Sequence, residues 1–180
     1  MAAPPTFYIG VDNTAQTTLL SDLSFGTANL GYKRTGNGAW SFQIVRPGWT
    51  VQCTNQPLNL TPAMSVAGLP QLGATYAPSV TDALASTPAI LISGLSDQVW
   101  QGSALPLALP GAPGCELLAA ADVAAVTFTD AAGAASQSVT VPNAQSLIGL
   151  QVFHQWAIWD PAANGLSIVT SDGGAATIGN

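Results

Sequence analysis

Charge is what this 180-residue sequence has least of, because only 7% of its residues are Asp, Glu, Lys or Arg. Ordinary soluble domains carry roughly 25%. Three basic residues stand against nine acidic ones, which leaves a net charge of −6. Phosphate backbones are bound by clustered Lys and Arg side chains. The cations here are Lys33, Arg34 and Arg46, so the composition argues against nucleic acid as a partner.

Long apolar runs are also missing. A bilayer crossing needs about 20 apolar residues, and the longest candidate, residues 115–128, is interrupted by Glu116 and Asp122. We therefore expect no membrane insertion. The start, "MAAPP", lacks the basic region and apolar stretch of a signal peptide. We interpret it as a mature N-terminus behind an added Met, and we expect a secreted or cell-surface protein whose signal peptide is absent from this sequence.

Cysteine and histidine are scarce, with two cysteines and one histidine. This set cannot supply the common four-ligand zinc site. In an exported protein an even number of cysteines suggests a disulfide. A bond between Cys53 and Cys115 would close a loop of 62 residues, worth about 4 kcal/mol in the chain-entropy model. The alternative is a pair of buried free thiols.

Motifs for hydrolysis are absent. No G-x-S-x-G elbow occurs, and Glu116 is the only glutamate, so a glycosidase carboxylate pair finds little support. Most of the eight aspartates stand in turn sequences, where they bond to the backbone. We expect no enzyme and no cofactor. The dense aspartate spacing of calcium loops is missing too, which leaves Asp12 in "VDNT" and Asp172 in "SDGG" as weak Ca²⁺ candidates.

Turn-forming residues recur every eight to twelve residues, with short apolar or alternating runs between them. This spacing predicts an all-β protein, an antiparallel β-sandwich of Ig-like or jelly-roll-like type. At most one short helix is expected, over residues 115–125, and an apolar strand is the alternative there. The chain end is predicted to form a hairpin that turns at Asp172, Gly173 and Gly174. The expected strands include residues 6–11, 16–26, 28–34, 39–45, 50–53, 71–83, 88–96, 123–129, 136–142 and 149–159.

The best candidate for a domain boundary is the proline-rich stretch 55–70, which has no clear period. We predict a linker or a long connection between sheets there. Residues 1–67 would form an N-terminal β region, either integrated into the same sandwich or folded as a separate small β domain. Residues 68–180 would form the C-terminal sandwich.

Residues 69–180 resemble a C-terminal module of secreted proteins from environmental bacteria. The matching pieces keep their order and spacing over about 110 residues; they are "GLPQLGATY", "PAILISGLS", "WQGSALPLAL", "GAPGCELL", "TDAAGAASQSVTVPN", "IGLQVFHQWAIWDPAANGL" and "VTSDGGAATIG". The resemblance implies a small β-sandwich of unassigned function with no catalytic motif. This sequence departs from the module at His154, where a small residue is usual.

Strand 149–159 contains the only histidine. Alternation places His154 on one face with Val152 and Trp156, which predicts a neutral histidine in the core with a local hydrogen-bond partner. Asp160 lies six residues along, about 20 Å away in an extended strand, so it cannot orient His154. A contact to a ligand, or catalysis with a partner from elsewhere in the chain, is the alternative.

Tryptophan is the strongest indication of binding, with five in the chain. Trp159 shares a predicted face with Gln151 and Gln155, which combines an aromatic platform with amide donors. Trp100 lies in a polar segment, "SDQVWQGS". These four residues are the candidate ligand-binding set, with glycans as the ligand. The alternative is that Trp159 covers a second sheet or a neighbouring subunit.

The function that this composition favours is structural. A surface with little charge repels copies of itself weakly, so we expect a non-catalytic, self-assembling or cell-surface protein that forms a homo-oligomer or filament. Residues 6–11 would then add to a neighbour's sheet. A carbohydrate-binding or adhesive module is the first alternative, and a secreted hydrolase is the second.

Overall fold

The computed structural model describes residues 18–24, 27–33, 41–45, 53, 58 and 60–180, and it is all-β, as predicted. A single 3₁₀ turn, η1 (Gln145–Leu147), is the helical element of this part of the chain. The strands are β1 (Thr18–Ser24), β2 (Thr27–Lys33), β3 (Ser41–Val45), β4 (Ala63–Ala67), β5 (Thr75–Thr81), β6 (Pro88–Gly94), β7 (Val99–Trp100), β8 (Ser103–Ala104), β9 (Leu107–Ala108), β10 (Glu116–Leu117), β11 (Val123–Phe128), β12 (Ala135–Ser136), β13 (Val139–Thr140), β14 (Gln151–Trp159) and β15 (Ile168–Thr177).

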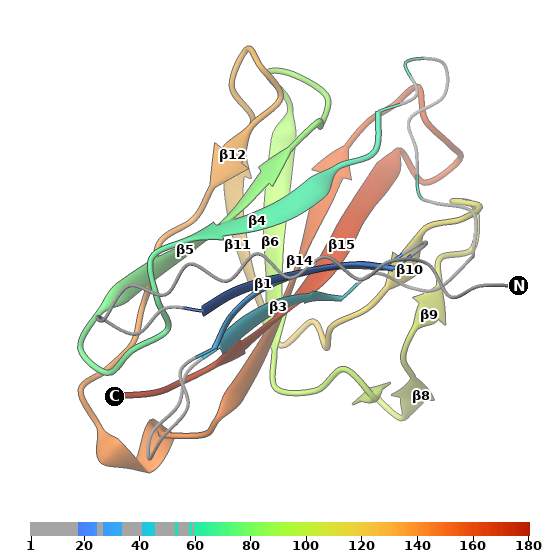
Figure 1. Ribbon diagram of the computed structural model, residues 1–180. Coiled ribbons are helices and arrows are strands. Elements are labelled where there is room, and N and C mark those ends of the chain that lie inside the picture. The colour runs from blue at the N-terminus through green and yellow to red at the C-terminus, as the bar shows by residue number, and fades with distance from the viewer. Residues whose placement is uncertain (1–17, 25–26, 34–40, 46–52, 54–57, 59) are drawn as a thin grey trace, which may run out of the picture.

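The strands form two facing layers. The larger sheet has seven strands in the order β1-β2-β3-β15-β14-β6-β11, and all its pairings are antiparallel. The smaller sheet has the order β12-β5-β13, and β4 also pairs with β5. Figure 1 shows β4 and β5 crossing in front of β6 and β11. The sheets do not close into a barrel, which agrees with a β-sandwich.

The core lies between the two sheets. Leu91, Trp156 and Ile158 of the larger sheet meet Tyr76 and Val80 of the smaller one, and each of these side chains is at most 1% exposed. Burial of a large apolar side chain contributes roughly 1.5–3 kcal/mol. The contact between the sheets is therefore the main source of stability in the described part of the chain.

The opposite face of the larger sheet is partly covered by residues 95–121, which we call the cover. The cover contains the short hairpins β7–β8 and β9–β10. Its leucines Leu105 and Leu117 pack with Ala120 in a second cluster, with Ile92 of β6 against them. Cover and sheet approach so closely that a Cβ added to Gly94 would lie 2.0 Å from the Ala120 carbonyl oxygen.

Cys53 and Cys115 form a disulfide, the pairing that the even cysteine count suggested. It ties the chain before β4 to the cover. Both residues are buried beside Val169 of β15, and the Thr170 N–H donates a hydrogen bond to the Cys53 sulfur at 2.9 Å. The bond therefore anchors the cover next to the first half of β15.

The structure corrects three predictions. Residues 115–125 are not helical, because β10 and the start of β11 pair with neighbours. The apolar strand alternative holds at these two ends and not over residues 118–122. The C-terminal hairpin is wrong, because β15 continues through residues 172–174 between β14 and β3, with a bulge where its pairing to β14 shifts between Gln155 and Ala157. The proposed linker 55–70 contains β4, whose Met64 is 4% exposed in the core. In each case pairing with another strand outweighs the local preference of the sequence.

Part of the N-terminal prediction lies outside the described residues, namely the strand over 6–11 and most of the strand over 50–53. β2 and β3 pair antiparallel, and β3 pairs with β15. These pairings put β1–β3 in the larger sheet, while the exact domain boundary stays a prediction. Within the described ranges, no helix has the length and apolarity that a membrane crossing needs.

Candidate functional site

β11 forms an edge of the larger sheet. It pairs with β6 on one side, and no described strand lies beyond it. The Thr129 N–H donates to the Thr87 carbonyl oxygen at 2.9 Å. This bond shows which alternate residues of β11 direct their backbone groups towards β6. By alternation, the backbone N–H and C=O groups of Ala124, Val126 and Phe128 point away from β6. An open strand edge of this kind is a template for pairing with another chain.

The side chains at this edge are apolar and exposed. Val126 and Phe128 are 65% and 66% exposed on the face that points away from the core. The register places Val126 across from Ile90 of β6 and thereby across from Ala157 of β14. Trp159, 47% exposed, lies on the same face at the end of β14. We call Val126, Phe128 and Trp159, with the half-buried Ile90 between them, the apolar edge.

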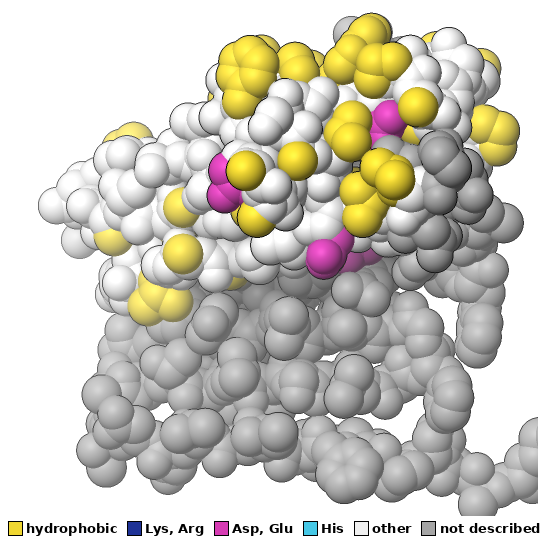
Figure 2. Space-filling view, turned by 90° about the horizontal axis from the view of Figure 1, so that it is seen from above, with side chains coloured by type: hydrophobic (Ala, Val, Ile, Leu, Met, Phe, Trp, Pro, Cys, Tyr) yellow, Lys and Arg dark blue, Asp and Glu magenta, His cyan; other side chains and the backbone are white. Residues whose placement is uncertain are grey.

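Figure 2 shows hydrophobic side chains gathered on the side of the molecule away from the grey residues, with few acidic side chains among them. Scattered apolar residues are normal on a protein surface, but contiguous exposed groups mark interaction sites. β11 itself contains neither charge nor proline, the two features with which proteins commonly protect an edge strand. The edge is therefore unprotected within its own sequence.

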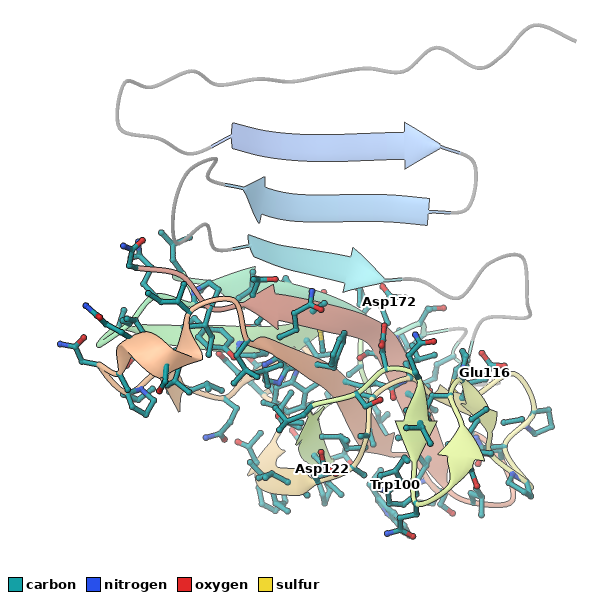
Figure 3. All side chains as sticks on the ribbon, turned by 90° about the horizontal axis from the view of Figure 1, so that it is seen from below. Trp100, Glu116, Asp122 and Asp172 are labelled. Atoms are coloured by element: carbon teal, nitrogen blue, oxygen red, sulfur yellow. A yellow bond between two sulfur atoms is a disulfide. The ribbon has the colours of Figure 1, made fainter. Side chains whose placement is uncertain are left out.

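The four residues predicted to bind a ligand do not come together. Gln151 and Trp159 stand at opposite ends of β14, roughly 26 Å apart at the rise of a strand. Trp100 is half-buried against the Leu105 and Leu117 cluster of the cover, and Figure 3 shows it within this segment. Trp159 is 47% exposed, so the described residues do not cover it with a second sheet. Ligand binding by Gln151, Trp100 and Trp159 stays a prediction, without a shared platform.

Gln155 is not an exposed amide, contrary to the prediction. It is 1% exposed, its amide nitrogen donates to the carbonyl oxygens of Glu116 and Ser171 at 2.9 and 3.0 Å, and its amide oxygen accepts the Leu118 N–H at 2.9 Å. The side chain therefore points at the cover and joins it to the sheet. Alternation indicates the face correctly, but not that another segment lies over it.

His154 joins the two sheets. As the alternation predicts, it lies on the core side of β14, where it is 1% exposed. Its Nε2 lies 2.8 Å from the Tyr76 hydroxyl of β5, and its Nδ1 lies 2.8 Å from the Ser93 hydroxyl of β6. These partners are 78 and 61 residues away in the sequence, so the prediction of a local partner is wrong.

Burial determines the protonation of this group. Desolvation lowers the pKa of His154 to about 4 and raises the pKa of Tyr76 well above its usual value of 10. At neutral pH the imidazole and the phenol are both uncharged. An imidazole with so low a pKa is a weak acceptor for the Ser93 proton, because general bases work best with a pKa near the operating pH. The arrangement therefore acts as a brace between the sheets.

The aspartates at the predicted turns bond to the backbone. The Asp130 carboxylate accepts the N–H groups of Ala132 and Ala134 at 2.8 and 2.9 Å, and Asp160 accepts the Ala162 N–H at 3.1 Å. These are the short-range bonds that make aspartate a turn residue. They explain these two aspartates as parts of the turns.

The calcium candidates gain no support from geometry. Asp172 lies within β15 rather than in a loop, and Asp12 lies outside the described residues. In the part of the chain that the structure describes, no group of three or more His, Cys, Asp or Glu side chains is placed to hold an ion.

No protein-family model, curated protein or solved structure matches this chain. The resemblance of residues 69–180 to a secreted module stays a prediction. Sequence reasoning found the strand over 123–129 but missed the exposure of its apolar side chains. A signal was available, because apolar residues occupy both faces of "VAAVTF", which requires either a cover on each side or one exposed face.

Proposed function

We propose that this protein is a non-catalytic, exported structural subunit that associates with copies of itself through β11. The observation that carries the proposal is an open strand edge flanked by the exposed side chains of Val126 and Phe128. Backbone groups of a second β11 supply the missing hydrogen bonds, and apolar side chains of both copies are removed from water. Each CH₂ group buried in this way contributes about 0.8 kcal/mol.

The charges of the chain support a second copy as the occupant. β11 has no charged residue, so two copies can pair without repulsion along the strand. Asp122 and Asp130 flank β11 at its two ends. Antiparallel pairing centred on Val126 brings Asp122 of one copy towards Asp130 of the other. Since salt screens this repulsion, association strengthens as salt is added.

Two further features support export. The chain contains a disulfide between Cys53 and Cys115, and disulfides persist in oxidising compartments outside the cytosol. Its low charge suits a surface that packs against identical neighbours rather than one that must stay apart from them in a crowded cytoplasm.

The test is the mass in solution, measured by light scattering over a range of protein and salt concentrations. The unsubstituted chain is expected to exceed its monomer mass of 18.2 kDa as either concentration rises. Val126→Lys puts a charge on the open edge and is expected to give a monomer. Ser65→Lys, on the exposed face of β4 in the smaller sheet, introduces the same charge elsewhere and is expected to associate normally.

A constant mass of 18.2 kDa for the unsubstituted chain contradicts the proposal. If Val126→Lys still associates and Ser65→Lys does not, the copies do not associate through β11, and this part of the proposal is contradicted. Association that weakens with salt contradicts the antiparallel arrangement.

Glycan binding is the second candidate, because Trp159 is 47% exposed at the end of β14 and flat aromatic rings stack on sugar rings. One variant, Trp159→Ala, distinguishes glycan binding from association through β11. Trp159→Ala is expected to abolish a fluorescence response to a glycan panel if sugars bind there. Its effect on the mass is expected to be smaller than that of Val126→Lys, because Trp159 belongs to β14 and not to the open strand β11.

A further inference from the structure

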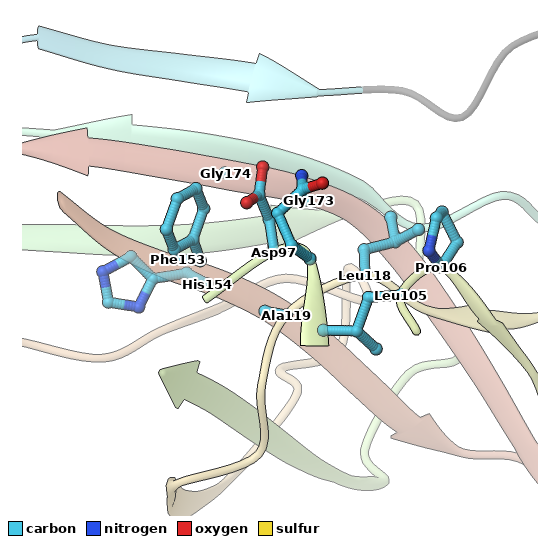
Figure 4. A pocket seen from close by; sticks show the side chains of 10 residues that line it. Asp97, Leu105, Pro106, Leu118, Ala119, Phe153, His154, Gly173 and Gly174 are labelled. Carbon is cyan, nitrogen blue, oxygen red and sulfur yellow. The ribbon is translucent and has the colours of Figure 1, made fainter. Parts of the chain in front are cut away.

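A pocket of about 260 Å³ lies between the cover and the larger sheet. Figure 4 shows it from close by. It is lined by Asp97, Gln98, Leu105, Pro106, Leu118, Ala119, Phe153, His154, Gly173 and Gly174. Drug-sized ligands occupy pockets of about 300–1,000 Å³, so this one suits a ligand of only a few heavy atoms.

The pocket arises because small residues surround the Phe153 ring on the larger sheet. The cross-strand neighbours of Phe153 are Gly94 of β6 and Ala175 of β15. Gly173 lies across from Gln155, and paired residues point to the same face of a sheet. A side chain at Gly173 would therefore enter the space beside Phe153 and under the cover. Glycine within a strand commonly marks a place where a ligand or a backbone approaches closely.

The walls of the pocket are held in place without a ligand. Two hydrogen bonds of Gln155 fix the cover at Glu116 and Leu118, and the Leu105 N–H donates to the Gln98 carbonyl oxygen at 2.9 Å. The His154 ring is engaged with Tyr76 and Ser93 in the core. Because the walls are preorganised, binding does not have to order them first.

Among the lining residues that the structure describes, Asp97 is the only ionisable side chain besides the neutral His154. It follows Ser96, whose hydroxyl accepts the N–H groups of Gln98 and Val99 at 3.1 and 3.0 Å, which fixes this turn. Asp97 is half-buried. Among the described residues, none donates a hydrogen bond or forms an ion pair with its carboxylate. A partly desolvated carboxylate beside apolar walls favours a cation with an apolar body.

We propose that this pocket binds a small organic cation of the alkylammonium class. The ammonium group lies at Asp97, within reach of the Phe153 ring, and the alkyl part packs against Leu105 and Leu118. Carboxylate and aromatic ring both favour a positive charge. The apolar remainder of the lining rejects strongly hydrated metal cations. This site is separate from the apolar edge, and the proposal does not rest on association through β11.

The experiment titrates the protein with n-butylammonium and with n-butanol, its neutral counterpart, and follows backbone amide shifts of Phe153 and Leu118 by NMR. n-Butylammonium is expected to bind at least about tenfold more tightly than n-butanol, and added salt is expected to weaken only the cation. Asp97→Asn is expected to remove this preference. Asp82→Asn, the matched control, removes the same charge from the exposed turn after β5 and is expected to keep the preference.

n-Butanol also shows whether Asp97→Asn still has an intact pocket, since its weak binding does not depend on the carboxylate. Equal binding of both probes to the unsubstituted protein overturns the proposal, as does the absence of saturable binding. A preference that survives in Asp97→Asn overturns the role of that carboxylate. Nα-acetyl-lysine methylamide then shows whether the natural ligand is a lysine side chain or a free amine. If it binds as tightly as n-butylammonium, the ligand is a lysine side chain, and if it does not bind, the ligand is a free amine.

The mass of Asp97→Asn by light scattering separates the two proposals. It is expected to match that of the unsubstituted chain, because Asp97 is not part of the open strand β11. A failure of cation binding with normal association therefore leaves the proposed structural function intact.

Discussion

The two faces of β14 meet different surroundings, although the residues on them alternate along one strand. On the core side, His154 bonds to Tyr76 of the smaller sheet, and Trp156 and Ile158 are at most 1% exposed. On the outer side, Gln155 bonds to the cover, but the strand then runs out from under it and Trp159 is 47% exposed. The difference teaches that the described part of the chain covers the core face of β14 from His154 to Ile158 and the other face only in part.

The largest expected effect is in the core. Trp156→Ala removes a side chain that is 0% exposed and is expected to lower the free energy of unfolding by about 3–5 kcal/mol. Phe128→Ala, on the exposed edge, is expected to change it by less than about 0.5 kcal/mol. Urea unfolding of a dilute monomer measures both. Similar losses for the two variants would mean that Phe128 is covered within the single chain.

The disulfide tests how much the attachment of the cover to the larger sheet contributes to stability. The double variant Cys53→Ala/Cys115→Ala opens a loop of 62 residues and is expected to lose about 2–4 kcal/mol of unfolding free energy. The control is the unsubstituted protein in a thiol reductant, which opens the same bond without changing a side chain. Unfolding midpoints in urea that remain unchanged in both experiments would contradict a stabilising role.

The buried histidine makes stability depend on pH. The pKa of His154 falls from 6.5 in the unfolded chain to about 4 in the folded one, so the unfolded state binds the proton first. Stability from the neutral form is complete above pH 6.5 and is lost as pH falls towards 4. Between pH 7.5 and 4.5 the expected loss is about 2 kcal/mol.

Urea midpoints at several pH values measure this loss. Because His154 is the only histidine, His154→Gln is expected to flatten the dependence between pH 7 and 5. A dependence that persists unchanged in this variant would assign it to other groups.

Gln155 gives a predicted loss of similar size to that of His154. Gln155→Leu leaves the Leu118 N–H and two carbonyl oxygens without their present partner, and the expected cost is about 1–3 kcal/mol. Gln151→Leu, at the exposed start of the same strand and on the same face, is the control and is expected to cost less than about 0.5 kcal/mol. Thermal unfolding compares the two. Equal midpoints would mean that Gln155 does not hold the cover in place.

How far the sequence predicts the site can be followed along β14. Alternation assigns His154 to the core face and Trp159 to the other, and both assignments agree with the structure. It does not identify Tyr76 and Ser93 as partners of His154, because they come from strands 78 and 61 residues away. It also leaves Gln155 free to bind a ligand, since nothing in the local pattern reveals that residues 116–118 lie over it.

By itself the sequence determines the class of the fold, through turn residues at short intervals and alternating runs, and it determines which side chains share a face of each strand. Because the chain has only two cysteines, the sequence also leaves one possible disulfide within the chain, between Cys53 and Cys115. Only the tertiary structure decides which faces are covered. It makes residues 172–174 the middle of a strand, turns Gln155 into a link to the cover and leaves Val126 and Phe128 exposed. The physical reason is that periodicity records the direction of a side chain, whereas burial depends on which distant segment packs against it.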